Sequence, residues 1–67
     1  MELIDTPNPN AKKIETDIQN DSILEKLNNI ENIDSVFFGP GFITITKKDA
    51  IEWELITQDI MNIFDRL

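Results

Sequence analysis

The segment "SVFFGPGFITIT" (residues 35–46) constrains the fold of this 67-residue chain more than any other stretch. Apolar and β-branched residues flank a Gly-Pro-Gly corner, a pattern typical of two strands joined by a tight turn. Pro40 and Gly41 suit the central positions of a type II turn, because proline presets φ and glycine accepts a positive φ. A longer connection is an alternative, since primed turns match strand twist better in two-residue hairpins.

The side-chain pattern of this hairpin favours one register. With a two-residue loop, Phe38 faces Ile43 and Val36 faces Ile45, so that all four apolar side chains share one face. A three-residue loop would pair Phe38 and Val36 with threonines and scatter the apolar side chains over both faces. Register is strongly specified wherever one face is buried. We therefore predict the first register; a four-residue loop has the same parity.

This register has a consequence for the opposite face of the hairpin. Phe37 and Phe42 fall there, together with Ser35, Thr44 and Thr46. In a two-layer domain that face meets solvent, so exposed aromatic rings on it are candidates for contact with a partner. Two structural alternatives stay open: the proline-rich N-terminal segment folds over the rings, or the rings pair diagonally across the strands.

Two short strands are expected before the hairpin. "MELID" (residues 1–5) is a possible first strand, and the prolines and asparagines of the following "TPNPN" end it by favouring a turn. In residues 11–18, the side chains of Ile14, Thr16 and Ile18 alternate with charged ones, which predicts a second strand.

Two helices are expected around the hairpin. Ser22 followed by Glu25 has the spacing of a capping box and predicts a first helix over about residues 22–30. Asp49 followed by Glu52 is a second start signal, after which an apolar stripe runs to the C-terminus at helical intervals. The stripe consists of Trp53, Ile56, Ile60, Ile63, Phe64 and Leu67.

These elements predict a single α+β domain over residues 1–67. Their order is ββαββα, and the economical packing is two layers, with both helices on one face of a four-stranded, mainly antiparallel sheet. The pattern leaves the strand order within the sheet open. Within this fold we expect Trp53 to belong to the core.

Composition excludes several classes of function. Thirteen acidic and six basic residues give a net charge of −7, which opposes contact with nucleic acid or an anionic membrane. The chain contains no cysteine and no histidine, so it lacks thiolate and imidazole groups for catalysis or metal binding. We therefore expect no enzyme and no bound cofactor; a carboxylate-based enzyme or hard-metal site is the competing interpretation. The N-terminus does not resemble a signal peptide, so a cytoplasmic location is expected.

Several motifs occur together in the order seen in one family. They are "TPNPN" before a strand, then "FFG", "FITITK" and a tryptophan ahead of the last helix. By these motifs the chain resembles the N-terminal domain of NifU-like (Nfu-type) iron–sulfur cluster scaffold proteins, from Thr6 to the final helix. Two details depart from the family pattern: the connection from Ile14 to the first helix is short, and Lys12 stands where an apolar residue is more usual.

The resemblance implies a function in iron–sulfur cluster assembly or transfer. In that family the cluster is held by a Cys-x-x-Cys pair in a second domain, which has no counterpart in this sequence. The chain is thus expected to act as a monomeric accessory domain through protein contacts, with the cluster on a partner. Implied partners are an iron–sulfur scaffold, a Cys-x-x-Cys Nfu domain or an apo-protein recipient. The alternative is a diverged or truncated stand-alone structural domain without a cluster role.

The candidate partner-binding residues combine the matching motifs with the exposed aromatic rings. They are Thr6, Pro7, Asn8, Pro9, Asn10, Phe37, Phe42 and Thr44. The segment Thr6–Asn10 also has a purely structural interpretation, because Asn-Pro steps form turns for conformational reasons.

Overall fold

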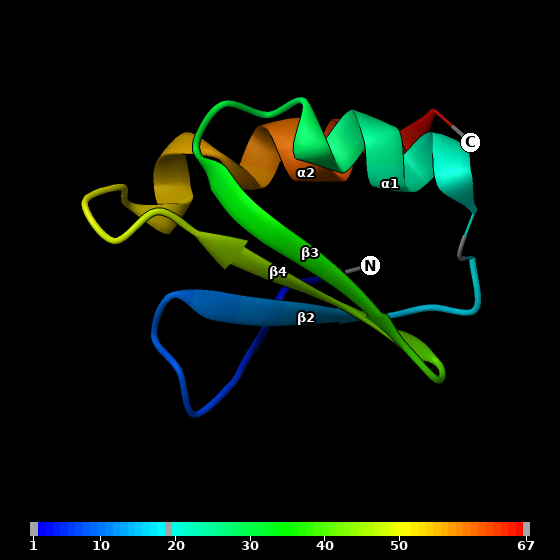
Figure 1. The fold of residues 1–67 in the computed structure, drawn as a ribbon, viewed down its shortest axis with the longest axis horizontal. Coiled ribbons are helices and arrows are strands. Elements are labelled where there is room, and N and C mark those ends of the chain that lie inside the picture. Colours follow the sequence, from blue (N-terminus) through cyan, green and yellow to red (C-terminus); the bar gives the residue numbers. More distant parts are fainter. Residues whose placement is uncertain (1, 19, 67) are drawn as a thin grey trace.

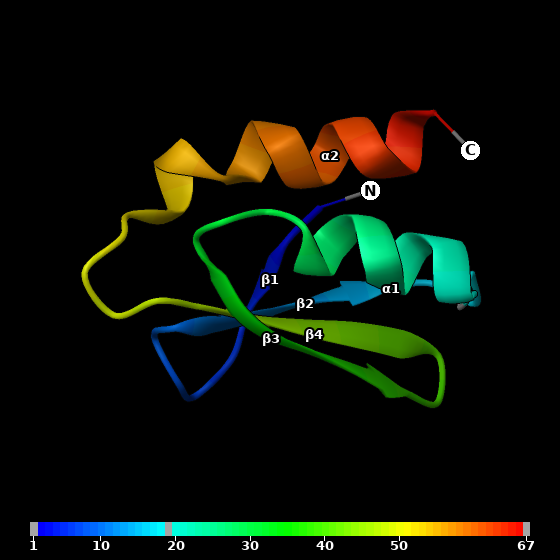
Figure 2. The ribbon, with the colours of Figure 1, turned by 45° about the horizontal axis from the view of Figure 1, so that its top comes forward.

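Four strands form one open antiparallel sheet, and two helices cover one of its faces (Figures 1 and 2). The computed structural model describes residues 2–18 and 20–66. The strands lie in the order β1-β2-β4-β3. They are β1 (Ile4–Asp5), β2 (Ala11–Glu15), β3 (Ile33–Gly39) and β4 (Phe42–Lys47), and the helices are α1 (Asp21–Asn28) and α2 (Thr57–Asp65). The predicted α+β fold is confirmed.

The β3–β4 hairpin has the predicted register. Phe38 pairs with Ile43, and Val36 pairs with Ile45. Gly41 has φ of 76°, the positive value that the third residue of a type II turn requires.

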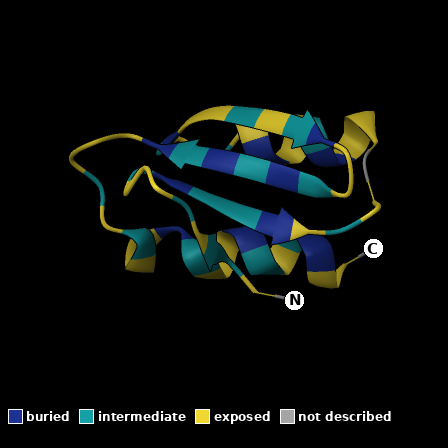
Figure 3. Ribbon diagram, turned by 90° about the horizontal axis from the view of Figure 1, so that it is seen from below, coloured by how far each residue is buried: buried dark blue, intermediate teal, exposed yellow. Residues whose placement is uncertain are grey.

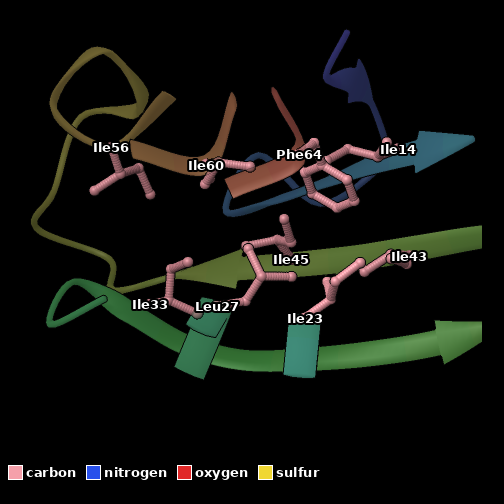
Figure 4. Close-up of a cluster of buried hydrophobic side chains, with 9 residues drawn as sticks. All are labelled: Ile14, Ile23, Leu27, Ile33, Ile43, Ile45, Ile56, Ile60 and Phe64. Atoms are coloured by element: carbon pink, nitrogen blue, oxygen red, sulfur yellow. The ribbon is translucent and has the colours of Figure 1, made fainter. Parts of the chain in front are cut away.

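The core fills the space between the sheet and the helices (Figure 4). Most of its side chains are isoleucines, whose β-branched shape suits the pleated face of a sheet. The strands contribute Ile14, Ile33, Ile43 and Ile45. The helical layer contributes Ile23, Leu27, Ile56, Ile60 and Phe64.

The second strand is shorter than predicted. It ends at Glu15, which pairs with the first residue of β4, and Ile18 is exposed instead of buried. The Thr16 N–H still bonds the Gly41 carbonyl oxygen at 3.1 Å, but Gly41 belongs to the turn before β4, so the ladder stops there. The hydroxyl of Thr16 instead accepts a hydrogen bond from the Ile18 N–H at 3.1 Å, and such local bonds turn the chain away from strand geometry.

The predicted capping box of the first helix is wrong. Asn20 is the N-cap of α1, and its Oδ1 accepts a hydrogen bond from the Ile23 N–H at 2.9 Å. Ser22 lies within the first turn. Ile23 and Leu27, one turn apart in α1, are fully buried against the sheet.

The predicted start of the second helix is also wrong. Asp49 and Glu52 precede a 3₁₀ turn, η1 (Trp53–Leu55), and α2 begins only at Thr57. The Asp49 carboxylate is engaged elsewhere, since it accepts a hydrogen bond from the side chain of Asn10. The predicted apolar stripe is buried at Ile56, Ile60 and Phe64. Leu67, in this stripe, and Met1, in the predicted first strand, lie outside the described residues.

In the part of the chain that the structure describes, no helix has the length and apolar character needed to cross a bilayer.

The cap assignment makes a direct prediction for stability. Asn20→Ala leaves the Ile23 N–H without its acceptor, and we expect it to lower the free energy of unfolding by about 1 kcal/mol. Ser22→Ala is the matched control and should change it by less than about 0.5 kcal/mol, because Ser22 is exposed in the first turn. Urea unfolding of both variants measures the difference. If Ser22→Ala lowers the free energy of unfolding more than Asn20→Ala does, Ser22 and not Asn20 is the N-cap.

Candidate functional site

The face of the sheet away from the helices carries a continuous row of side chains. Ile4 pairs with Lys13, Lys13 with Thr44, and Thr44 with Phe37. Side chains of directly paired residues project from the same side of a sheet. Because Ile43 and Ile45 point to the helices, this row points away from them. We call the surface formed by Ile4, Lys13, Phe37, Phe42 and Thr44 the open face; Figure 3 looks onto this side of the sheet.

Two phenylalanines dominate the open face. Phe37 is 62% exposed, whereas Phe42 is half-buried. Their ring centroids lie 6.4 Å apart with the planes tilted by 45°, so the predicted diagonal pairing exists. Phe37 nevertheless keeps most of its surface in solvent.

The Phe42 ring lies over Gly39, its cross-strand partner. A methyl group at Gly39 would lie 2.6 Å from both Cε atoms of that ring, which is closer than non-bonded carbons approach. Glycine is therefore required at this position so that the ring can lie flat on the backbone of β3.

The loop Thr6–Asn10, which joins β1 to β2, has its own internal hydrogen bonds. The Thr6 hydroxyl lies 2.8 Å from the Ala11 carbonyl oxygen and accepts a hydrogen bond from the Asn8 N–H. Asn8 Oδ1 accepts a bond from the Asn10 N–H at 2.9 Å. Short side chains that bond nearby backbone groups stabilise turns in this way.

The same loop is tied to distant parts of the chain. The indole Nε1 of Trp53 donates to the Pro9 carbonyl oxygen at 3.0 Å. The Asn10 side chain accepts a bond from Lys47 Nζ at 2.9 Å and donates one to Asp49 Oδ1 at 2.7 Å. These contacts join residues 37 to 44 positions apart, so the loop is fixed by tertiary structure as well as by its own sequence.

Two lysines lie against Trp53. Lys12 Nζ is 5.4 Å and Lys47 Nζ 6.0 Å from the ring centroid, within the range of cation–π attraction. Lys12 is on the helix-facing side of β2, as Ile14 is, and its ammonium group lies 3.3 Å from Asp5 Oδ1. The aliphatic stem of a lysine can cover apolar surface while its charge stays solvated. This explains how the sequence tolerates Lys12 where its resemblance to the family led us to expect an apolar residue.

The structure places the predicted site residues in two groups. Phe37, Phe42 and Thr44 gather on the open face. The loop Thr6–Asn10 lies at the other end of the sheet from the β3–β4 turn, so it does not fold over the phenylalanines (Figure 1). The two groups therefore do not form one compact surface, and their role in binding a partner stays a prediction.

Sequence reasoning missed two residues of this region. Lys47 is only 7% exposed because it continues the buried alternation of Ile43 and Ile45, a pattern that the sequence already contained. Gly39 is the partner of Phe42 in the predicted register, so its close approach to the ring could also have been found.

The open face offers apolar, hydroxyl and main-chain contacts. Within the described residues, no group of three or more histidine, cysteine, aspartate or glutamate side chains gathers to hold a metal ion.

Comparison with known proteins gives a family and several relatives. Residues 12–67 match the family described as "Scaffold protein Nfu/NifU N terminal". The human protein "NFU1 iron-sulfur cluster scaffold homolog, mitochondrial" is 37% identical over 73 residues, which cover 84% of this chain and 29% of the human protein. The "NifU-like protein C1709.19c" of Schizosaccharomyces pombe is 34% identical over 44 residues, covering 66% of this chain and 17% of that protein. The chain thus spans less than a third of the length of these relatives.

Two solved structures are similar in fold. The crystal structure of protein SAV1430 from Staphylococcus aureus has a TM-score of 0.84 at 19% identity, covering 96% of this chain and 95% of that one. The solution structure of SeR13 from Staphylococcus epidermidis has a TM-score of 0.62 at 24% identity, covering 98% and 94%. At these identities the likeness concerns the fold alone.

The packing of Phe42 on Gly39 can be tested with a double-mutant cycle. We expect Gly39→Ala to lower the free energy of unfolding by about 1–3 kcal/mol, because the added methyl group displaces the ring. In a Phe42→Ala background the same substitution should cost clearly less. Equal costs in both backgrounds, measured by urea unfolding, would contradict the close approach.

The anchoring of the loop makes a second prediction. Trp53→Phe keeps an aromatic ring but removes the N–H that bonds Pro9, so we expect a loss of about 1 kcal/mol in the free energy of unfolding. Hydrogen exchange of the Asn10 amide should become faster. Leu55→Ala, in the same 3₁₀ turn but 65% exposed, is the control that should leave that exchange rate unchanged. Unaltered exchange in Trp53→Phe would show that the indole bond does not hold the loop.

Proposed function

This chain belongs to the family of Nfu/NifU N-terminal scaffold domains, and on that premise we propose that it is a non-catalytic accessory domain in iron–sulfur cluster assembly or transfer. It acts through protein contacts and does not itself ligate the cluster. The single observation that carries this proposal is the open face, where a phenylalanine that is 62% exposed stands beside a second ring on the side of the sheet opposite α1 and α2.

The composition of the chain supports a non-ligating role. Iron–sulfur clusters are held by cysteine thiolates, in some centres with histidine, and this chain contains neither residue. The cluster would therefore be cargo on a partner. In the resemblance described above, that partner is a Cys-x-x-Cys Nfu domain, with an iron–sulfur scaffold or an apo-protein recipient as further candidates.

The surface chemistry supports contact with protein rather than with nucleic acid or an anionic membrane. The net charge of −7 opposes both polyanions. Aromatic residues are enriched at protein–protein interfaces and supply much of their binding energy. We propose that the chain is a monomer whose open face is completed by a partner. A cytoplasmic location stays a prediction, since the similar human protein is named as mitochondrial.

The proposed function predicts saturable binding to a separate Cys-x-x-Cys Nfu domain, with the cluster loaded or absent. In an NMR titration of the isotope-labelled chain, the shifted amides should include those of Phe37, Phe42 and Thr44. We expect Phe37→Ser to weaken binding about tenfold, because it removes the exposed ring at the centre of the contact.

Leu55→Ser is the matched control for this experiment. Leu55 is as exposed as Phe37, at 65%, but lies in η1, in the helical layer, so its loss should leave binding within about twofold. If the two variants bind as wild type does, the open face is not the contact surface. If the wild-type chain binds neither form of the Nfu domain, an iron–sulfur scaffold or an apo-protein recipient must be tested next. Absence of binding to these proteins would favour the alternative, a stand-alone structural domain.

A further inference from the structure

Strand β3 is an edge of the sheet and has main-chain groups free to pair. The strand order β1-β2-β4-β3 leaves one side of β3 without a neighbouring strand in the described part of the chain. β3 is seven residues long, whereas β1, at the other edge, has only two. An extended edge strand of this length is a template for another strand.

The hydrogen bonds of β4 identify which groups of β3 face outward. The Lys47 N–H bonds Asn10, next to β2, and the Lys48 N–H bonds Asn32, next to β3. Because successive residues of a strand alternate in direction, the main-chain groups of Thr44 point to β3. Its partner Phe37 therefore points inward.

By the same alternation, the N–H and C=O groups of Val36 and Phe38 point away from the sheet. Among the described residues, the backbone bonds outside helices and strands include none from these two residues. An added antiparallel strand could bond all of these groups and would place a residue directly opposite Phe37. That position is the close, non-hydrogen-bonded kind of pair, in which side chains approach most nearly.

The ends of the edge are closed, so only a short strand fits. The ladder is irregular between Ile33 and Ser35, where a residue bulges, and Pro40 has no N–H to donate. Bulges and prolines are devices that guard sheet edges against unspecific pairing. They leave Ser35–Gly39 as the accessible segment.

Charge selects the occupant of this edge. Between Leu27 and Thr46 the chain has two carboxylates, Glu31 and Asp34, and no lysine or arginine. In an antiparallel pair of β3 strands centred on Phe37, Asp34 of each copy would lie opposite Pro40 of the other. The carboxylates would therefore not meet, but a second copy would add another net charge of −7, which disfavours self-pairing. A strand that carries lysine or arginine has the complementary charge.

We propose that β3 accepts an extended segment of a partner protein as a fifth strand, with a basic residue near Asp34 and an apolar side chain against Phe37. This mode of recognition obtains affinity from main-chain hydrogen bonds and specificity from alternate side chains. The inference rests on the proposed function and deepens it, because it states the kind of segment that a cluster-carrying partner would present.

The test uses two probes with the isotope-labelled full chain. One is the separate Cys-x-x-Cys Nfu domain, and the other is a capped peptide that alternates threonine and valine between terminal lysine pairs. We expect the lysine peptide to slow hydrogen exchange at the Val36 and Phe38 amides. A peptide with glutamates in place of the lysines should bind about tenfold more weakly.

Val36→Pro and Val36→Ala separate the main chain from the side chain. Val36→Pro removes an N–H that does not bond β4, so the hydrogen bonds between β3 and β4 are kept. Val36→Ala keeps that N–H but removes more side-chain atoms than the proline does. We expect Val36→Pro to weaken peptide binding about tenfold and Val36→Ala to have a clearly smaller effect. Should the proline variant fail to fold, the exchange rates of the wild-type chain still decide the question.

The two probes distinguish the two proposals. If the peptide binds at β3 and the Nfu domain does not bind, the result supports the proposal that β3 accepts a fifth strand. It also counts against the Nfu domain as the partner. Binding of the Nfu domain with unchanged exchange at Val36 and Phe38 supports the proposed function and overturns the edge. If neither probe binds, the proposal for β3 is overturned as well. It is also overturned if both Val36 variants lose peptide affinity equally.

Discussion

The alternation of β4 is the constraint on which the rest of the structure depends. This strand lies between β2 and β3 in the sheet and pairs with both, so its alternation fixes the register of both strands together. Ile43 and Ile45 fill the space under the helices, and Phe42 and Thr44 take the other face. A shift of one residue would exchange these faces, expose two fully buried isoleucines and bury the phenylalanine. In a chain of this size the core has no reserve to absorb such a loss.

Much of the fold could be predicted from the sequence because the decisive patterns are local. The hairpin register followed from the alternation around Pro40 and Gly41, and the buried positions of the last helix followed from a stripe at helical spacing. The errors fell at element ends. Asn20 and Ser22 are both good N-caps by residue type, so propensity does not choose between them; in the structure the Asn20 side chain accepts the Ile23 N–H. Asp49 resembled a cap, but its carboxylate is used by Asn10 in a contact that spans 39 positions.

In the candidate site, too, some features could be predicted from local sequence patterns and others could not. The exposure of Phe37 was accessible to sequence reasoning, since parity alone placed it opposite the buried side chains. The anchoring of the Thr6–Asn10 loop was not, because it depends on Trp53 and Lys47, whose positions relative to the loop are set by tertiary structure. "TPNPN" and the tryptophan were recognised as parts of one family pattern, and their link is physical: the indole N–H bonds the carbonyl of Pro9.

An exposed aromatic ring beside an open strand edge is a hazard for aggregation, and this chain contains features that limit it. The edge is short, a bulge and a proline close its ends, and two carboxylates, Glu31 and Asp34, lie in or just before β3. The net charge of −7 makes copies of the chain repel one another, although salt weakens this repulsion. None of these features opposes a basic strand. Under the proposal for β3, the same charges that make copies of the chain repel one another would favour a partner strand of opposite charge. One feature would then both oppose self-association and contribute to specificity.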